Sequence, residues 1–117
     1  MCRMTGVAED TLDLVREFKR RVELRFGDRI RAVYLFGSRA RGDHSPESDA
    51  DAAVVFSGSV QRPFPLISQM VDDAYDLLLE RGIYISPKAF AANSLTAPDT
   101  HPSPDLARTV LRDGIRV

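Results

Sequence analysis

The chain reads IRAVYLFGSRARGDHSPESDADAAVVF from residue 30 to residue 56, and this stretch decides the fold class. Its apolar ends predict two buried β-strands, one over residues 30–36 and one over residues 49–56. The segment between them, residues 37–48, is polar and rich in turn residues, which favours a loop with about one helical turn. If both strands belong to one sheet, the bend that leaves the first strand can face the acidic start of the second.

Two further segments, residues 10–26 and 66–81, have apolar residues at the spacing of an amphipathic helix. A last helix is predicted from Pro104 to Asp113. Asp10 and Ser103 are placed to cap the first and the last of them, and Pro104 suits a first helical position. A glycine follows the predicted end of each helix, at residues 27, 82 and 114.

A third, short strand is predicted over residues 83–86, where Pro87 ends it, and loops are expected over residues 57–65 and 91–102. The order of elements is then helix, strand, loop, strand, helix, strand, helix. This order predicts one domain over residues 1–117 with an α/β (α+β) fold, in which helices cover a small mixed β-sheet.

The composition excludes several classes of protein. The 117 residues carry a formal net charge of -1, which argues against a strongly basic nucleic-acid binder. The longest apolar runs have about five residues, far short of a membrane span. The single cysteine, Cys2, cannot form an internal disulfide, so we expect a reducing, cytoplasmic location. Together with the distant His44 and His101, it makes no zinc ligand set.

Asp49 and Asp51 lie two residues apart at the start of the second predicted strand. Side chains two apart in a strand share a face, so the two carboxylates repel each other unless a cation relieves the repulsion. Mg²⁺ prefers a few carboxylates together with water and substrate phosphates. The pair is therefore a candidate platform for a magnesium-bound nucleotide, and a solvent-exposed polar strand end is the alternative.

Gly37 and Ser38 directly follow the first predicted strand. A glycine lets the backbone approach a phosphate closely, and a serine hydroxyl with exposed N–H groups can bind phosphate oxygens. The lysine of a Walker loop and the glycine spacing of a dinucleotide-binding turn are both missing. An ordinary turn is the alternative for this dipeptide taken alone.

Taken together, Gly37-Ser38 and, about ten residues later, Asp49-x-Asp51 resemble the signature of the polymerase-beta-like nucleotidyltransferases. The fuller string is similar to that of the minimal nucleotidyltransferase (MNT) branch. The resemblance implies the fold of that superfamily, with Gly37 and Ser38 holding a nucleoside triphosphate. It implies that Asp49 and Asp51 bind Mg²⁺ and are the catalytic residues, transferring a nucleoside monophosphate, AMP from ATP, to a hydroxyl acceptor.

The resemblance also implies a partner. MNT proteins are often the antitoxins of HEPN-family toxins, and some of them transfer AMP to a tyrosine of the toxin. We therefore expect a HEPN-type protein partner, no membrane and no direct nucleic-acid ligand, and a homo-oligomer is compatible with the sequence. Transfer to a small molecule, as in the aminoglycoside nucleotidyltransferases, is a further reading, but 117 residues leave little chain for the acceptor site.

The sequence departs from the family pattern at one place. Active family members often carry a third carboxylate on the next strand, but the matching tract, residues 82–87, holds no acid. Asp72, Asp73 and Asp76 precede it and are expected on the solvated face of a helix. The alternative function is therefore a catalytically inactive antitoxin that neutralises its partner by binding.

Two arginines and a histidine lie inside the motif. Arg39 is predicted to bind the nucleotide, and Arg41 is a second candidate for the triphosphate or for acidic groups of an acceptor. A solvated loop is the alternative for both. His44 could act as an acid or base near neutral pH, although its loop position favours no catalytic role. Tyr75 and Tyr84 are expected to pack.

Overall fold

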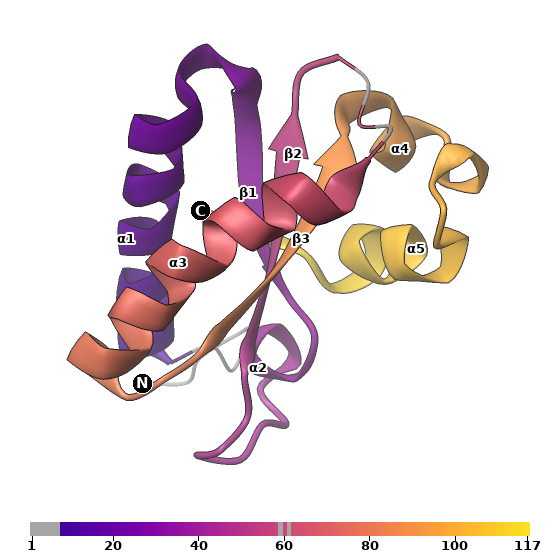
Figure 1. The fold of residues 1–117 in the computed structure, drawn as a ribbon. Coiled ribbons are helices and arrows are strands. Elements are labelled where there is room, and N and C mark those ends of the chain that lie inside the picture. Colours follow the sequence, from indigo (N-terminus) through magenta and orange to yellow (C-terminus); the bar gives the residue numbers. More distant parts are fainter. Residues whose placement is uncertain (1–7, 59, 61) are drawn as a thin grey trace.

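A computed structural model describes residues 8–58, 60 and 62–117 (Figure 1). The strands are β1 (Ile30–Phe36), β2 (Ala50–Phe56), β3 (Ile85–Ala91) and β4 (Ile115–Arg116). The helices are α1 (Glu9–Phe26), α2 (Ser38–Arg41), α3 (Pro63–Arg81), α4 (Ala92–Thr96) and α5 (Pro104–Asp113), with short 3₁₀ turns η1 (Gly27–Arg29) and η2 (Pro98–Thr100). Cys2, and with it the prediction that concerned it, lies outside the described residues.

The sheet is mixed, and its strand order among the described residues is β3-β2-β1-β4. β1 runs antiparallel to β2 and to β4, whereas β2 and β3 are parallel. A parallel pair needs a crossover connection, and α3 provides it between β2 and β3. The α/β architecture with a small mixed sheet is the one that the sequence predicted.

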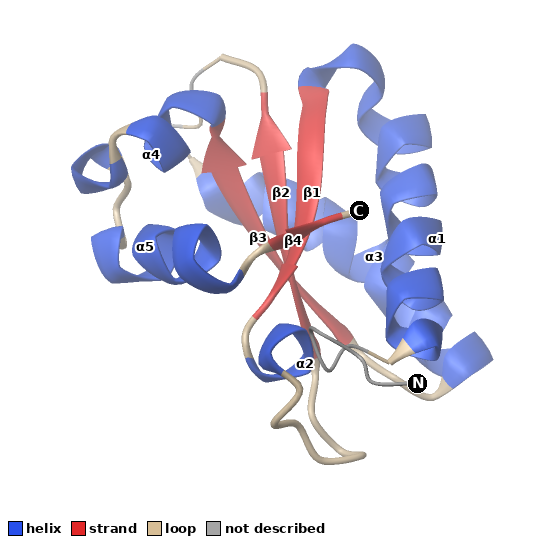
Figure 2. Ribbon diagram, turned by 180° about the vertical axis from the view of Figure 1, so that it is seen from behind, coloured by secondary structure: helices blue, strands red, loops and turns tan. Residues whose placement is uncertain are grey.

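Helices cover both faces of the sheet. α1 and α3 lie on one face in Figure 1, and Figure 2 shows α5 on the opposite face. The side chains of β2 point alternately to the two faces of the sheet. Val54 and Phe56 pack with α1 and α3, whereas Val55 packs with α5. Phe18, Phe56 and Phe90 are fully buried. Each such side chain contributes about 1.5–3 kcal/mol through burial.

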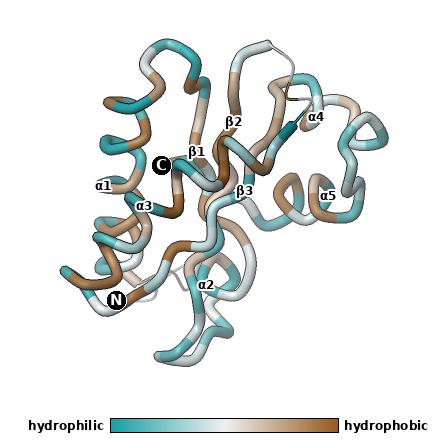
Figure 3. The backbone as a smooth tube through the Cα atoms, in the orientation of Figure 1, coloured by the Kyte–Doolittle hydropathy of each residue, from teal (hydrophilic) through white to brown (hydrophobic). Residues whose placement is uncertain are grey.

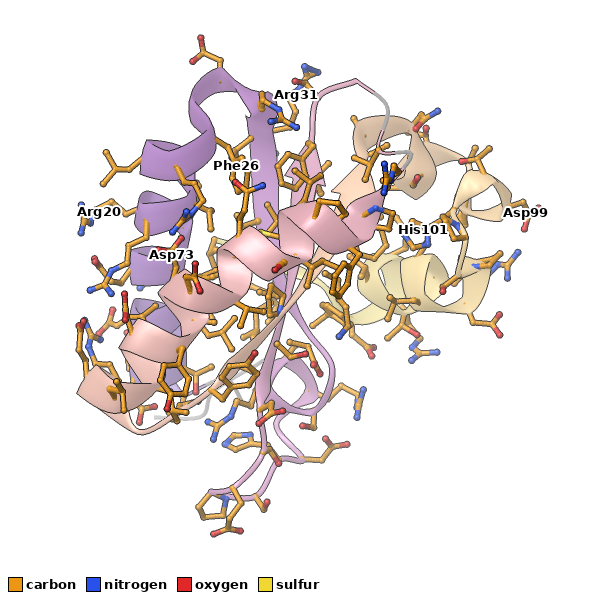
Figure 4. The ribbon with its side chains drawn as sticks, viewed as in Figure 1. Arg20, Phe26, Arg31, Asp73, Asp99 and His101 are labelled. Atoms are coloured by element: carbon orange, nitrogen blue, oxygen red, sulfur yellow. The ribbon has the colours of Figure 1, made fainter. Side chains whose placement is uncertain are left out.

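Ion pairs join the two helices of the larger layer. Arg25 of α1 donates two hydrogen bonds to the carboxylate of Asp73 on α3, at 3.0 and 3.1 Å. Arg21 reaches Glu80 on α3 in the same way. Asp73 lies on the side of α3 that faces α1 (Figure 4), so the expectation of a solvated position for this residue is wrong.

Several boundaries differ from those that the sequence predicted. α3 begins at Pro63, because proline has no N–H to lose at the first helical turn. The sequence predicted that the third strand ends at Pro87, but β3 continues through Pro87 to Ala91. β3 is an edge strand, and a proline there can turn its missing donor away from the sheet.

The ends of the chain's elements also show differences. α1 begins at Glu9, so Asp10 lies within the first turn and is not the cap. Ser103 does occupy the N-cap position of α5, yet its side chain makes no capping hydrogen bond. Part of the loop predicted over residues 91–102 forms α4 and η2, and residues 59 and 61 of the loop predicted over 57–65 lie outside the described part.

The strands form the apolar centre of the molecule, whereas the segment that follows α2 is largely hydrophilic (Figure 3). This segment lies at the end of the sheet where β1 ends and where both β2 and β3 begin (Figure 1). Among the described residues, no helix combines the length and the apolar character that crossing a membrane requires.

Candidate active site

The site lies at the turn between β1 and α2, next to the start of β2. Phe36, the last residue of β1, is the register partner of Asp51 in β2. The antiparallel pairing therefore brings the residue after Phe36, which is Gly37, to the acidic start of β2. Residues that are far apart along the motif thus meet at one end of the sheet, as the sequence predicted for two strands of one sheet.

Gly37 has a backbone conformation that a residue with a side chain avoids, with φ 78° and ψ -156°. A Cβ atom added at this position would overlap Oδ2 of Asp51. The carboxylate of Asp51 therefore lies directly against the backbone of Gly37. Glycine is required here both for the turn and for the close approach.

The Gly37 turn leads straight into the single helical turn of α2. The carbonyl of Gly37 accepts hydrogen bonds from the N–H groups of Ala40 and Arg41, at 3.1 and 3.0 Å. Ser38 is the first residue of the helix, so its N–H group has no intrahelical acceptor. The turn therefore presents a half-buried serine and backbone donors next to Asp51, which is the type of surface that binds a phosphate oxygen.

The two aspartates differ in their surroundings. Asp49 precedes β2 and is exposed, whereas Asp51 lies within the strand and is half-buried. The pKa of the Asp51 carboxyl is raised, chiefly because burial disfavours its charged form, and the negative charge of Asp49 raises it further. The positive charges of Lys88 and Arg41 act in the opposite direction. The two carboxylates are thus close enough to influence each other.

The aspartate pair fits a hard divalent cation. A cation beside Asp51 would remove the electrostatic cost that raises the pKa of this side chain. Within the described residues, no group of three or more His, Cys, Asp and Glu side chains is arranged for metal binding. Two carboxylates would leave the other positions of Mg²⁺ to water and to phosphate oxygens, which matches the preference of this ion.

Arg39 has a structural role that the sequence did not predict. Its side chain is buried, and only 3% of the residue is exposed. The guanidinium donates to the carbonyl oxygens of Ser48 and Pro46, at 2.9 and 3.3 Å, and to the hydroxyl of Thr11 at 3.0 Å. Arg39 therefore holds the segment before Asp49 against α1, and nucleotide binding by this residue stays a prediction.

Arg41 and His44 are placed on different sides of the site. Arg41 pairs with Asp43 and with Asp113 of α5, both at 3.1 Å, and its charge also reaches Asp51. His44 lines a pocket whose lining includes Arg39 but not Gly37, Asp49 or Asp51. Nδ1 of His44 is buried and has no hydrogen-bond partner among the described residues. The charge of Arg41 thus acts on Asp51, whereas His44 lines a separate pocket.

The neighbour of Asp51 on the adjacent strand β3 is Ser86. The parallel register pairs these two residues, so their side chains lie on the same face of the sheet. Lys88 lies two residues further along β3 and donates a hydrogen bond to the hydroxyl of Ser86, at 3.0 Å. No acid stands beside Asp51 on β3, which agrees with the departure from the family pattern. Lys88 lies beyond the predicted end of this strand at Pro87, and the register that brings Ser86 beside Asp51 is not visible in the sequence.

The mixed sheet, the Gly37 turn and the acid pair define the class: a nucleotidyltransferase fold. The family model for the nucleotidyltransferase domain matches residues 15–95 of the chain. The chain therefore belongs to the nucleotidyltransferase-domain family, which confirms the resemblance to minimal nucleotidyltransferases.

Three proteins of Methanocaldococcus jannaschii, each named a "putative protein adenylyltransferase", are similar to this chain. One is 35% identical over 72 residues, which are 62% of this chain and 65% of that protein. The second is 37% identical over 46 residues, covering 39% and 46%, and the third is 28% identical over 90 residues, covering 77% and 61%. The matched part is thus less than two thirds of the length of each relative.

A solved structure shares the fold. It is described as a "putative nucleotidyltransferase" from Sulfolobus solfataricus, with a TM-score of 0.56 and 24% sequence identity. The match covers 99% of this chain and 89% of that chain. The whole described architecture, including the sheet that carries the acid pair, therefore has the fold of that structure.

Proposed function

We propose that the chain transfers AMP from ATP to a hydroxyl group of a protein, in a reaction that depends on Mg²⁺. The observation that carries this proposal is the contact between the Asp51 carboxylate and the backbone of Gly37. It brings a cation-binding pair and a phosphate-binding turn into one site. The names of the relatives support a protein acceptor, because each of the three is named a "putative protein adenylyltransferase".

The chain's own residues would divide the work between charge and position. Asp49 and Asp51 would hold Mg²⁺, which supplies positive charge that neutralises the triphosphate and favours the leaving pyrophosphate. Ser38 and the Gly37 turn would hold the terminal phosphates, and the α-phosphorus is the atom that the acceptor attacks. The acceptor oxygen forms the new bond to this phosphorus, the bond to the β-phosphate oxygen breaks, and the hydroxyl proton passes to solvent.

The acceptor that we propose is a tyrosine of a HEPN-type partner protein. This step is supported by the resemblance to MNT antitoxins alone. The test mixes the chain with ATP, Mg²⁺ and the protein encoded beside it, and measures the mass of the partner. We expect the mass to rise by one AMP group, and we expect Asp49→Asn and Asp51→Asn to abolish the rise. An unchanged partner mass with every nucleoside triphosphate would overturn transfer to this acceptor.

A second function, neutralisation of the partner by binding alone, is favoured by one observation. The position beside Asp51 on β3 holds Ser86, and Lys88 follows, so this strand brings no third carboxylate to the site. The same two variants discriminate between the functions. Neutralisation that survives in Asp49→Asn and Asp51→Asn supports binding alone, whereas its loss in well-folded variants supports transfer.

A further inference from the structure

Lys88 brings a positive charge to the face of the sheet that carries Asp51. The register places Ser86 beside Asp51 and Lys88 beside Ala53, in adjacent parallel strands. Residues two apart in a strand share a face, so the side chains of Ser86 and Lys88 lie on the same side as Asp51. The lysine therefore belongs to the surroundings of the acid pair.

The ammonium group of Lys88 is held in place. Its Nζ donates to the hydroxyl of Ser86 at 3.0 Å. Its side chain lines a pocket of about 300 Å³, together with Ile67 of α3 and Leu106 of α5. The hydrogen bond to Ser86 directs the charged end of Lys88 toward the residue that is paired with Asp51.

Lys88 has hydrogen-bonding capacity that the described residues do not use. None of the ion pairs found within the described part of the chain includes this lysine. An ammonium group can donate several hydrogen bonds, and Ser86 accepts one. A half-buried ammonium without a paired carboxylate is suited to an anionic ligand.

The charge of Lys88 also lies near the acid pair, because Lys88 is on the strand next to Asp51 and on the same face of the sheet. A positive charge at this position on the neighbouring strand should weaken the binding of a free metal ion to the acid pair, because the two cations repel each other. It should strengthen the binding of a triphosphate, which is negatively charged. The two ligands are therefore expected to respond to Lys88 with opposite signs.

We propose that Lys88 is a binding residue for the triphosphate, and that its ammonium donates to a phosphate oxygen of the nucleotide bound between the Gly37 turn and the acid pair. This inference rests on the proposed function, since it concerns the nucleotide of the same site. The ammonium of Lys88 is a permanent positive charge of the protein, next to the Mg²⁺ ion that binds and dissociates. Part of the positive charge that the triphosphate requires thus belongs to the protein.

The test compares Lys88→Met with Arg31→Met, which removes the same charge elsewhere. Arg31 lies near the start of β1, at the far end of this strand from the Gly37 turn (Figure 4). Arg31 lies five positions before Phe36 in the strand, a distance of roughly 16 Å that exceeds the screening length at about 0.1 M salt. Binding of Mn²⁺ alone is followed by electron paramagnetic resonance, and binding of ATP at saturating Ca²⁺ by calorimetry.

In Lys88→Met we expect Mn²⁺ alone to bind about three to ten times more tightly, and ATP about ten times more weakly. Lys88→Arg should retain most of the ATP affinity, because it keeps the charge, and Arg31→Met should change neither. Unchanged affinities in Lys88→Met would overturn the inference. Parallel losses of both affinities would do the same, since they indicate a merely structural role.

The outcomes separate this inference from the proposed function. In one outcome the wild-type chain binds ATP but modifies no protein, and Lys88→Met binds Mn²⁺ more tightly and ATP more weakly. This outcome contradicts transfer and supports the role of Lys88. A chain that transfers AMP while Lys88→Met binds Mn²⁺ and ATP normally supports transfer and contradicts that role. A wild-type chain that binds neither ligand contradicts both.

Discussion

The carboxylate of Asp51 occupies the space that a side chain at residue 37 would fill. The contact is set by the sheet, since Phe36 is paired with Asp51 and Gly37 follows it. It is therefore present before any ligand binds. The position of the acid relative to the turn is a property of the fold, and changes at either residue should be felt at the other.

Gly37→Ala tests this contact directly. The added methyl group would overlap Asp51, and the left-handed φ of 78° strains any residue with a Cβ atom. We expect a loss of about 2 kcal/mol in the free energy of unfolding and a loss of Mn²⁺ affinity of about tenfold or more. Urea unfolding and metal titration measure the two effects.

The matched control is Gly82→Ala. Gly82 also has a left-handed φ, 80°, but a Cβ atom there would meet nothing within 4 Å. This variant should lose about 1 kcal/mol of stability and keep its affinity for Mn²⁺. Normal metal binding by Gly37→Ala would show that the contact with Asp51 does not position the carboxylate.

Asp51→Asn should stabilise the fold while it removes metal binding. The pKa of Asp51 is raised, above all by burial, so the ionised carboxylate destabilises the folded state. The loss of stability from this charge begins as pH rises past 3.8, the ordinary pKa of the carboxyl, and is complete above its pKa in the folded state. In the absence of divalent ions, we therefore expect Asp51→Asn to be more stable than the wild type at pH 7. The difference should disappear below pH 3.8.

Glu47→Gln serves as a control, because Glu47 is an exposed acid of the same loop. Its stability should follow that of the wild type at every pH. Adding Mg²⁺ should stabilise the wild type and leave Asp51→Asn unchanged, since the ion binds the folded carboxylate pair. An Asp51→Asn variant that is less stable than the wild type at pH 7 without divalent ions contradicts this account.

The sequence was sufficient for features that depend on neighbouring residues. The strands that flank the motif, the turn at Gly37 and the helical turn after it follow from local apolar runs and turn residues. The two aspartates were recognised in the same way, because their spacing is visible in the sequence. Only Asp51 lies within the strand, so the exposure of Asp49 could not be read from alternation alone.

The features that the sequence could not supply depend on pairings between distant segments. β4 has only two residues, and its place beside β1 is set by tertiary contact. The continuation of β3 through Pro87 depends on its position at the edge of the sheet. Lys88 joins the site through the parallel register with β2, which no local pattern encodes. The same is true of Arg39, whose partner Thr11 lies 28 residues earlier in the chain.

Arg39→Lys tests whether this arginine positions the loop. A lysine cannot reproduce the forked contacts of a guanidinium, so the carbonyls of Ser48 and Pro46 would lose donors. We expect a loss of about 1–3 kcal/mol in unfolding free energy and faster amide hydrogen exchange over residues 42–49 without any nucleotide. Arg41→Lys, at the exposed neighbouring arginine, should leave this exchange unchanged. Normal exchange in Arg39→Lys would favour direct nucleotide binding as the main role of Arg39.

Glu17 should make the stability of the α1 layer depend on pH. Hydrogen bonds from Arg20 and Arg21 lower the pKa of this carboxyl from 4.5 to about 2, and Arg21 also binds Glu80 of α3. A pKa that is lower in the folded state stabilises the protein above pH 4.5, and this contribution is lost as pH falls through about 2. Glu17→Gln should therefore be less stable than the wild type at pH 6, and the gap should close between pH 4.5 and 2. Glu23→Gln, on the same helix, alters none of these contacts and should show no such gap in urea unfolding across the series. A gap for Glu17→Gln that stays constant down to pH 2 would assign its effect to packing and not to charge.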